Sequence, residues 1–184
     1  MLSETSNPDG VATLERPSPH ERAETTRQLV EAAFNHGDFR LVRELTAPEA
    51  ISHDPTMPSE LQAMRGPEPF VRQVSTYRDA FPDLHFSVED TIAEGDTVVL
   101  RWRSEGTHRG PLRGLAPTDV HGSSTGISIS RWDGGKIVES WVEWDNLGLA
   151  RQIGAAPPEG SLPERLATAA QQLVARRLRR QSSR

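Results

Sequence analysis

The hydrophobic pattern of this 184-residue chain changes its period once, at Pro82. Before Pro82, apolar residues recur at helical spacing, most clearly over residues 29–34. After it, apolar and polar residues alternate, first over residues 86–92 and then over residues 98–103. Helices followed by an antiparallel meander indicate an α+β fold, because parallel sheets need helices between their strands.

Three helices are predicted before Pro82. The first covers His20–His36 and stops at Gly37, and Asp38 then caps a short second helix. Prolines near the start and just past the end mark the third helix, Pro67–Phe81. A turn or strand is expected at Ile51–Pro55. Three helices can cover one face of a sheet and enclose a pocket against it.

Four strands are predicted after Pro82, and a helical turn at Leu147–Ile153 closes the pattern. Tight turns at residues 94–96 and 133–135 and a Gly/Pro-rich loop at Gly106–Asp119 separate them. The third and fourth strands cover Gly122–Trp132 and Lys136–Asp145. The expected architecture is a four-stranded antiparallel sheet with the N-terminal helices on one face.

We predict one domain, residues 20–154, with two extensions. Residues 1–19 lack periodicity and are rich in Ser, Thr and Pro, which indicates disorder. Residues 155–184 begin as a Pro/Gly linker and continue as an amphipathic helix. Residues 161–184 hold six arginines and one glutamate, a charge of +5, so the rest of the chain carries −10. This basic helix can contact an anionic surface or lie solvated, whereas the acidic body argues against nucleic-acid binding.

Several classes of protein are excluded by what the sequence lacks. Without cysteine there are no disulfides, thiolate metal sites or cysteine nucleophiles. The phosphate-loop, dinucleotide-binding, zinc-protease and α/β-hydrolase motifs are absent. His53 and Asp54 could supply two metal ligands, but no third is evident, so no metal is predicted. With no secretory signal and no apolar run of membrane-spanning length, we expect a cytoplasmic protein.

The strand Ile137–Asp145 combines Trp141 and Trp144 with three carboxylates in its last seven residues. Such a strand suits the wall of an apolar pocket, where a carboxylate is desolvated and made available for general acid/base catalysis. Ordinary alternation is the alternative, with one tryptophan in the core and Glu139 and Glu143 in water.

Five further side chains are candidates for acid/base chemistry, because strand ends of a meander can converge at one mouth. They are His53, Asp54, His108, Glu143 and Asp145. Each also has a structural explanation. His53 and Asp54 can form a turn before Pro55, His108 can satisfy loop carbonyls, and Asp145 can cap the helical turn that follows it.

Four segments together form a pattern known from one family: Leu29–Gly37, Gly106–Asp119, Asp133–Glu139 and Asp145–Gly154. Through them, residues 24–154 resemble the SnoaL-like polyketide (ester) cyclases, which have the nuclear-transport-factor-2-like cone fold. The resemblance implies a curved, antiparallel or mixed sheet that the N-terminal helices wrap around a deep apolar pocket. It also implies no cofactor and a homodimer formed through the exposed face of the sheet.

The chain departs from the family at the catalytic positions. In the antibiotic cyclases of this family, an aspartate on the last strand moves a proton next to a carbonyl, with a histidine on the preceding strand. These two positions fall on Val142 and Ser128. A β-bulge near Trp141 could turn Glu143 inward. Otherwise Asp145, at the end of the strand, must take the role.

We therefore predict a cofactor-independent cyclase or isomerase of secondary, polyketide-like metabolism such as antibiotic biosynthesis. By reaction class it would be a lyase or an isomerase. It would act on a hydrophobic, oxygenated small molecule by general acid/base catalysis. The candidate catalytic residues are Asp145, Glu143, His53 and His108. The candidate substrate-binding residues are Trp102, Trp144, Tyr77, Phe81, Ser128 and Val142. Two alternatives stay open: an epoxide-opening cyclase or hydrolase, and a non-catalytic binding or dimerisation module. No nucleic-acid or membrane partner is expected.

Overall fold

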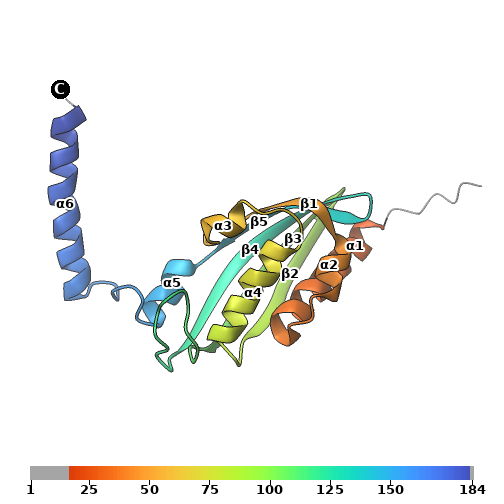
Figure 1. Cartoon of the computed structure of the whole chain (residues 1–184), viewed down its shortest axis with the longest axis horizontal. Coiled ribbons are helices and arrows are strands. Elements are labelled where there is room, and N and C mark those ends of the chain that lie inside the picture. Colours follow the sequence, from red (N-terminus) through yellow and green to blue (C-terminus); the bar gives the residue numbers. More distant parts are fainter. Residues whose placement is uncertain (1–16, 183–184) are drawn as a thin grey trace, which may run out of the picture.

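The structure, a computed structural model, describes residues 17–182 (Figure 1), so most of the segment predicted to be disordered lies outside the described residues. Six α-helices, one π-helical turn and five strands follow one another along this part of the chain. In order they are α1 (Pro19–Glu31), η1 (Ala32–His36), α2 (Arg40–Leu45), β1 (Thr46–His53), α3 (Ser59–Gln62), α4 (Glu68–Ala80), β2 (His85–Glu94), β3 (Thr97–Thr107), β4 (His121–Asp133), β5 (Lys136–Trp144), α5 (Asn146–Gln152) and α6 (Leu162–Ser182).

The sheet has the strand order β1-β5-β4-β3-β2. Strands β2 to β5 form the predicted antiparallel meander. All four strands predicted after Pro82 are present. The sheet has a fifth strand, because β1, which overlaps the turn or strand expected at Ile51–Pro55, adds to the edge as a parallel partner of β5. The single-sequence pattern of Thr46–His53 is mixed and contains Pro48, so its extended form depends on pairing with β5, a contact that local sequence does not encode. The α+β fold class is confirmed.

Local sequence signals explain the boundaries of the N-terminal helices. Ser18 accepts a hydrogen bond from the Glu21 amide while the Glu21 carboxylate accepts from Ser18, which forms a capping box at the start of α1. Gly37 ends η1 in the left-handed conformation, with φ of 66°. Pro69 lies in the first turn of α4, where a missing amide proton costs nothing.

The core lies between the sheet and the helices that cover one of its faces (Figure 1). Alternate residues of β3, such as Leu100 and Trp102, are buried against α1 and α4. The rings of Phe34 and Phe86 stack with centroids 4.4 Å apart, which joins η1 to β2. Burial of this inner face is the main favourable term in forming the layer.

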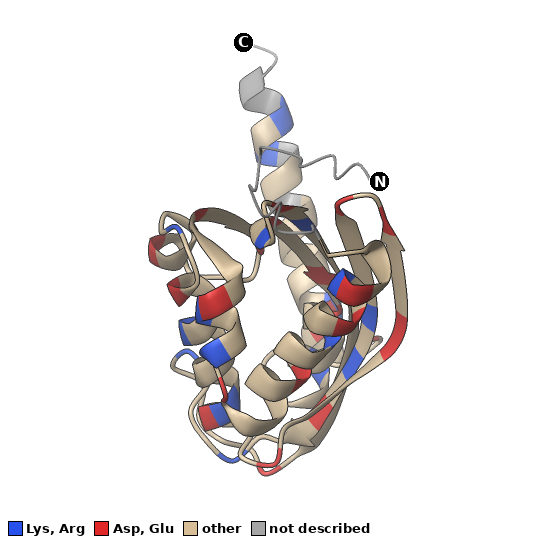
Figure 2. Cartoon of the chain, turned by 90° about the vertical axis from the view of Figure 1, so that its right-hand side faces the viewer, with Lys and Arg blue, Asp and Glu red and all other residues tan. Residues whose placement is uncertain are grey.

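Helix α6 lies apart from this core. It projects away from the body and carries basic residues (Figures 1 and 2). Its first turn is held by an ion pair between Glu164 and Arg151 of α5, and Leu162 and Leu166 are exposed. No helix within residues 17–182 is long and apolar enough to cross a membrane.

The loop after β3 is fastened to the end of α4 by backbone contacts at Gly110. The amides of Arg109 and Gly110 both donate to the Ala80 carbonyl, at 3.0 and 2.9 Å. A Cβ atom on Gly110 would lie 2.0 Å from the Asp79 carbonyl oxygen, so only glycine allows this approach.

Gly110→Ala should therefore lower the free energy of unfolding by about 3 kcal/mol, the upper range for overpacking. Gly114→Ala is the matched control in the same loop: nothing lies within 4 Å of its Cβ, and only its φ of 86° is unfavourable for alanine. That control should lose about 1 kcal/mol. Urea unfolding of both variants measures the difference, and equal losses would contradict the steric explanation.

Candidate functional site

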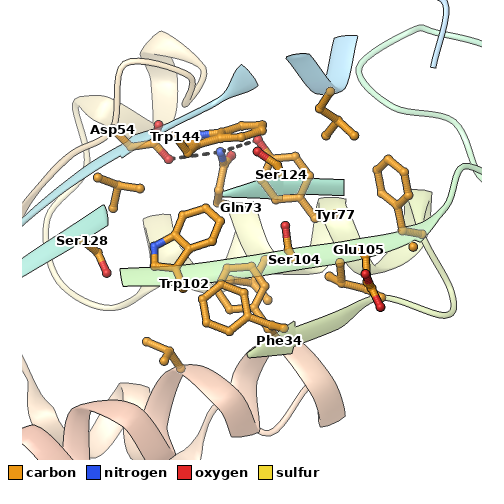
Figure 3. Close-up of a pocket in the computed structure, with 18 of the residues that line it drawn as sticks. Phe34, Asp54, Gln73, Tyr77, Trp102, Ser104, Glu105, Ser124, Ser128 and Trp144 are labelled. Carbon is orange, nitrogen blue, oxygen red and sulfur yellow. Dashed lines mark hydrogen bonds between the residues drawn. The ribbon is translucent and has the colours of Figure 1, made fainter. Parts of the chain in front are cut away.

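A pocket opens between the inner face of the sheet and helices α1 and α4. It encloses about 890 Å³ of space, part of which is open to solvent. A concave site of this kind, between a sheet and its covering helices, suits a small organic ligand. Most of its wall is apolar and aromatic, as the close-up in Figure 3 shows. All six residues predicted to bind substrate line it: Trp102, Trp144, Tyr77, Phe81, Ser128 and Val142.

Strand alternation decides which residues of β5 reach the pocket. Val142 and Trp144 line it, and Ser128 of β4 lies directly opposite Val142 in the sheet register. The family's two catalytic positions therefore do face the pocket, but neither holds a titratable group in this chain. Glu143 points the other way, opposite the exposed Ile127. The pairing around Trp141 is regular, so the bulge that could have turned Glu143 inward is absent.

Asp145 lies just beyond the strand and serves as the N-cap of α5. Its Oδ1 accepts a hydrogen bond of 2.7 Å from the Gly148 amide. The Asp145 side chain is exposed and does not line the pocket.

His53 lies on the outer face of the sheet. Its Nε2 is 2.9 Å from Oε1 of Glu139, and its ring stacks on Trp141 with centroids 5.3 Å apart. Hydrogen bonds from Arg131 and then from His53 lower the pKa of Glu139. This ionic cluster is separated from the pocket by the sheet itself.

His108 is fully buried beneath the loop after β3, at 0% exposure. Its Nδ1 lies 3.2 Å from the Thr118 hydroxyl, and its ring packs against Phe81, which lines the pocket. Among the described residues, no hydrogen-bond partner reaches Nε2. His108 thus supports the pocket from behind, and the structure brings none of the four predicted catalytic side chains into the pocket.

Two carboxylates line the pocket, Asp54 and Glu105. The Glu105 side chain is partly exposed and pairs with Arg103 at 3.5 Å, so Asp54 is the buried one. Because residues alternate along β1, His53 faces outward while Asp54, the next residue, faces inward at 7% exposure. Its Oδ1 accepts from the Thr56 amide at 2.8 Å and from the Thr56 hydroxyl at 2.7 Å. Its Oδ2 has one long contact, 3.4 Å from Nε2 of Gln73. Oδ2 is therefore the oxygen with room to accept a proton.

Tyr77, on α4, is linked to this carboxylate through the Gln73 amide, which lies between them (Figure 3). The Tyr77 oxygen accepts from Gln73 Nε2 at 3.2 Å and from Arg113 Nη2 at 3.3 Å. Burial raises the pKa of Tyr77, against smaller lowering effects from Thr56 and Arg113. The phenol is therefore protonated at neutral pH and can donate to a ligand oxygen.

The indole rings of Trp102 and Trp144 form a further part of the pocket wall. Trp144 packs edge-on against Tyr77, with centroids 5.8 Å apart, and its Nε1 donates to the Thr56 hydroxyl at 3.2 Å. Gly126 makes room for both residues, because a Cβ there would lie 2.4 Å from the Trp102 ring and 2.7 Å from Cβ of Trp144.

Gln73 and Arg113 were missed by sequence reasoning, and Asp54 was considered only together with His53. One signal was available for Gln73: it is a polar residue on the apolar face of α4, with Phe70, Val74 and Tyr77 at helical spacing. Nothing in the local sequence marks Arg113, which reaches the site from a loop 36 residues beyond Tyr77. In the described part of the chain, no group of three or more His, Asp or Glu side chains is arranged to hold a metal ion.

With this geometry in view, the comparisons with known proteins fix the family. The model of the SnoaL-like polyketide cyclases matches residues 24–153. The chain belongs to this family. No curated protein matches it.

Solved structures of this family superpose on the chain. IdmH of Streptomyces antibioticus, a proposed polyketide cyclase, is 31% identical, with a TM-score of 0.61 over 73% of this chain and 99% of IdmH. AclR of Streptomyces galilaeus, a proposed hydroxylase, is 27% identical, with a TM-score of 0.65 over 76% of this chain and all of AclR. A Catenulispora acidiphila protein with a ketosteroid isomerase-like fold, 15% identical and with a TM-score of 0.58 over 73% of this chain and 98% of its own, supports the fold alone.

Two substitutions at Asp145 separate its role as a helix cap from the effect of its charge on stability. Asp145→Ala should lower the free energy of unfolding by about 1 kcal/mol, because the Gly148 amide loses its acceptor. Asp145→Asn should stay near wild type, since asparagine caps equally well. Chemical denaturation of the two variants measures this, and equal losses would show that the charge, rather than the cap, matters.

Proposed function

We propose that this SnoaL-like protein is a cofactor-independent cyclase or isomerase whose general base is Asp54 and whose general acid is Tyr77. The membership of the family supports a cyclase-type role. The observation that carries the residue assignment is a buried carboxylate and a protonated phenol, joined through the Gln73 amide, in a largely apolar pocket.

The reaction would begin with a proton removed from a carbon next to a carbonyl. Oδ2 of Asp54 takes this proton, because Oδ1 already accepts two hydrogen bonds from Thr56. The electron pair moves toward the carbonyl oxygen, where the Tyr77 hydroxyl donates a hydrogen bond or its proton. The resulting enolate or enol attacks a second carbonyl of the same molecule for ring closure, or is reprotonated elsewhere for isomerisation.

The pocket wall suits a hydrophobic substrate with few oxygen atoms. The aromatic rings Phe34, Phe86, Trp102 and Trp144 provide flat apolar surfaces, and water is largely displaced when such a ligand binds. Ser104 and Ser124 add hydroxyls to this wall.

The test measures proton abstraction directly on an aromatic 3-oxo ester as probe, by deuterium uptake from heavy water in NMR. Asp54→Asn should slow the uptake by about 10²–10⁴-fold, because the amide cannot act as a base. Asp145→Asn and Glu143→Gln are the matched controls, since both side chains lie outside the pocket, and should retain the rate. An Asp54→Asn variant with the full rate would refute the assignment, and a slow Glu143→Gln or Asp145→Asn would point to that residue instead.

Tyr77→Phe tests the acid separately. The variant keeps the ring that packs against Trp144 but lacks the hydroxyl, so the uptake should slow by about 10²-fold while the melting temperature changes little. Because phenylalanine cannot donate a proton, a variant with the full rate would exclude Tyr77 as the acid.

Epoxide opening is the second candidate, since the same pair could activate water and protonate the epoxide oxygen. The similarity to AclR, a proposed hydroxylase, supports this second candidate function. Styrene oxide in oxygen-labelled water separates the two, because only hydrolysis places solvent oxygen in the product.

The homodimer stays a prediction. Its expected place is the outer face of the sheet, where Ile127 is 48% exposed and Ile129 and Trp141 lie opposite one another in the register.

A further inference from the structure

Arg113 lies in the loop between β3 and β4, outside the pocket wall, yet its guanidinium contacts both groups beside Asp54. We infer that Arg113 is a positioning residue, which orients the Gln73 amide and the Tyr77 hydroxyl toward Asp54. The inference rests on the function proposed above and assigns a residue to it that neither the sequence pattern nor the comparisons indicate.

The first support is the geometry of the guanidinium. Nη1 donates to the backbone carbonyl of Thr56, and Nη2 donates to Oε1 of Gln73 at 2.9 Å and to the Tyr77 oxygen at 3.3 Å. The guanidinium carbon also lies 5.6 Å from the centroid of the Tyr77 ring. Three acceptors on two segments need a planar group with several fixed donors, which arginine has and lysine lacks.

The second support is the orientation of the Gln73 amide. Because Oε1 accepts from Arg113, Nε2 is directed at Asp54 Oδ2 at 3.4 Å and at the Tyr77 oxygen at 3.2 Å. A flipped amide would aim its oxygen at the Asp54 carboxylate and its nitrogen at the Arg113 guanidinium, and would lose both of these contacts. Arg113 thus decides which end of Gln73 faces the base.

The third support is electrostatic. Burial raises the pKa of Tyr77, while the positive charge of Arg113 acts in the opposite direction. A phenol whose anion is partly stabilised gives its proton more readily to a substrate oxygen. The same arginine therefore orients the acid and adjusts its strength.

The loop is built to hold this side chain in place. Arg113 has a φ of 49°, a conformation that few residues other than glycine adopt. Leu112 beside it is buried and pairs with Leu115 across a short bridge. Together with the Gly110 contacts, this fastens the backbone on both sides of the turn.

The test uses the fact that Tyr77 is the chain's single tyrosine, so phenolate absorbance reports this group alone. The intact protein is titrated by rapid pH jumps, with the spectrum recorded before unfolding. Arg113→Met should titrate at higher pH than wild type, because the stabilising charge is lost. Arg109→Met is the matched control: Arg109 is in the same loop and pairs with Asp119 and Asp83 instead. Its titration should equal wild type.

An unchanged Tyr77 midpoint in Arg113→Met would overturn the inference. Should that variant not fold, Arg113→Lys decides through the side-chain amide signal of Gln73 in nitrogen-15 NMR at neutral pH. This signal should move, because Oε1 loses its partner in the arginine fork, and an unmoved signal would overturn the inference as well.

Neither readout depends on turnover. A fully active Asp54→Asn would therefore reject the proposed function. The effect of Arg113 on Tyr77 and Gln73 would still be tested separately, by the Tyr77 titration and the Gln73 signal. On the 3-oxo ester probe, Arg113→Met should lower kcat more than it changes KM, because the substrate-binding wall is untouched, whereas a change confined to KM would argue against positioning.

Discussion

The burial of the Asp54 carboxylate is the constraint on which the rest of the pocket depends. A charged oxygen removed from water costs several kcal/mol unless hydrogen bonds replace its hydration. Thr56 supplies two of these bonds and Gln73 a third, longer one. Trp144 and Arg113 in turn hold Thr56 and Gln73. Elements as distant as β1, α4, the loop after β3 and β5 are thus connected through one carboxylate.

The alternation of side chains along strands explains which predictions succeeded. The period-two pattern after Pro82 located β2 to β5 and their turns, and the pocket face of β5 followed from the family register. The same rule separates Asp54 from His53 and Val142 from Glu143. The edge position of β1 could not be predicted, because its pairing partner lies about 90 residues further along the chain.

The candidate site was harder to predict because its contacts join three separate segments. Thr56, Gln73 and Arg113 meet only after α4 packs on the sheet and the loop folds back over it. Local patterns favoured residues near strand ends, and so drew attention to Asp145, which is a helix cap, and to His108, which supports Phe81. Asp145 and His108 stand out in the sequence because structural roles, such as capping a helix, also require polar residues at particular positions.

The indirect link between Arg113 and Asp54 has a consequence for the chemistry. A direct arginine–carboxylate fork would satisfy both carboxylate oxygens and lower the basicity of the group, which suits a structural ion pair. Here Gln73 and Thr56 stand between the two charges. The carboxylate receives the hydrogen bonds that its burial requires, yet Oδ2 keeps a free lone pair directed at the pocket. Ser128 and Val142 leave the family's usual positions without a titratable group, and the proposed acid/base pair lies between the end of β1 and α4 rather than on β4 and β5.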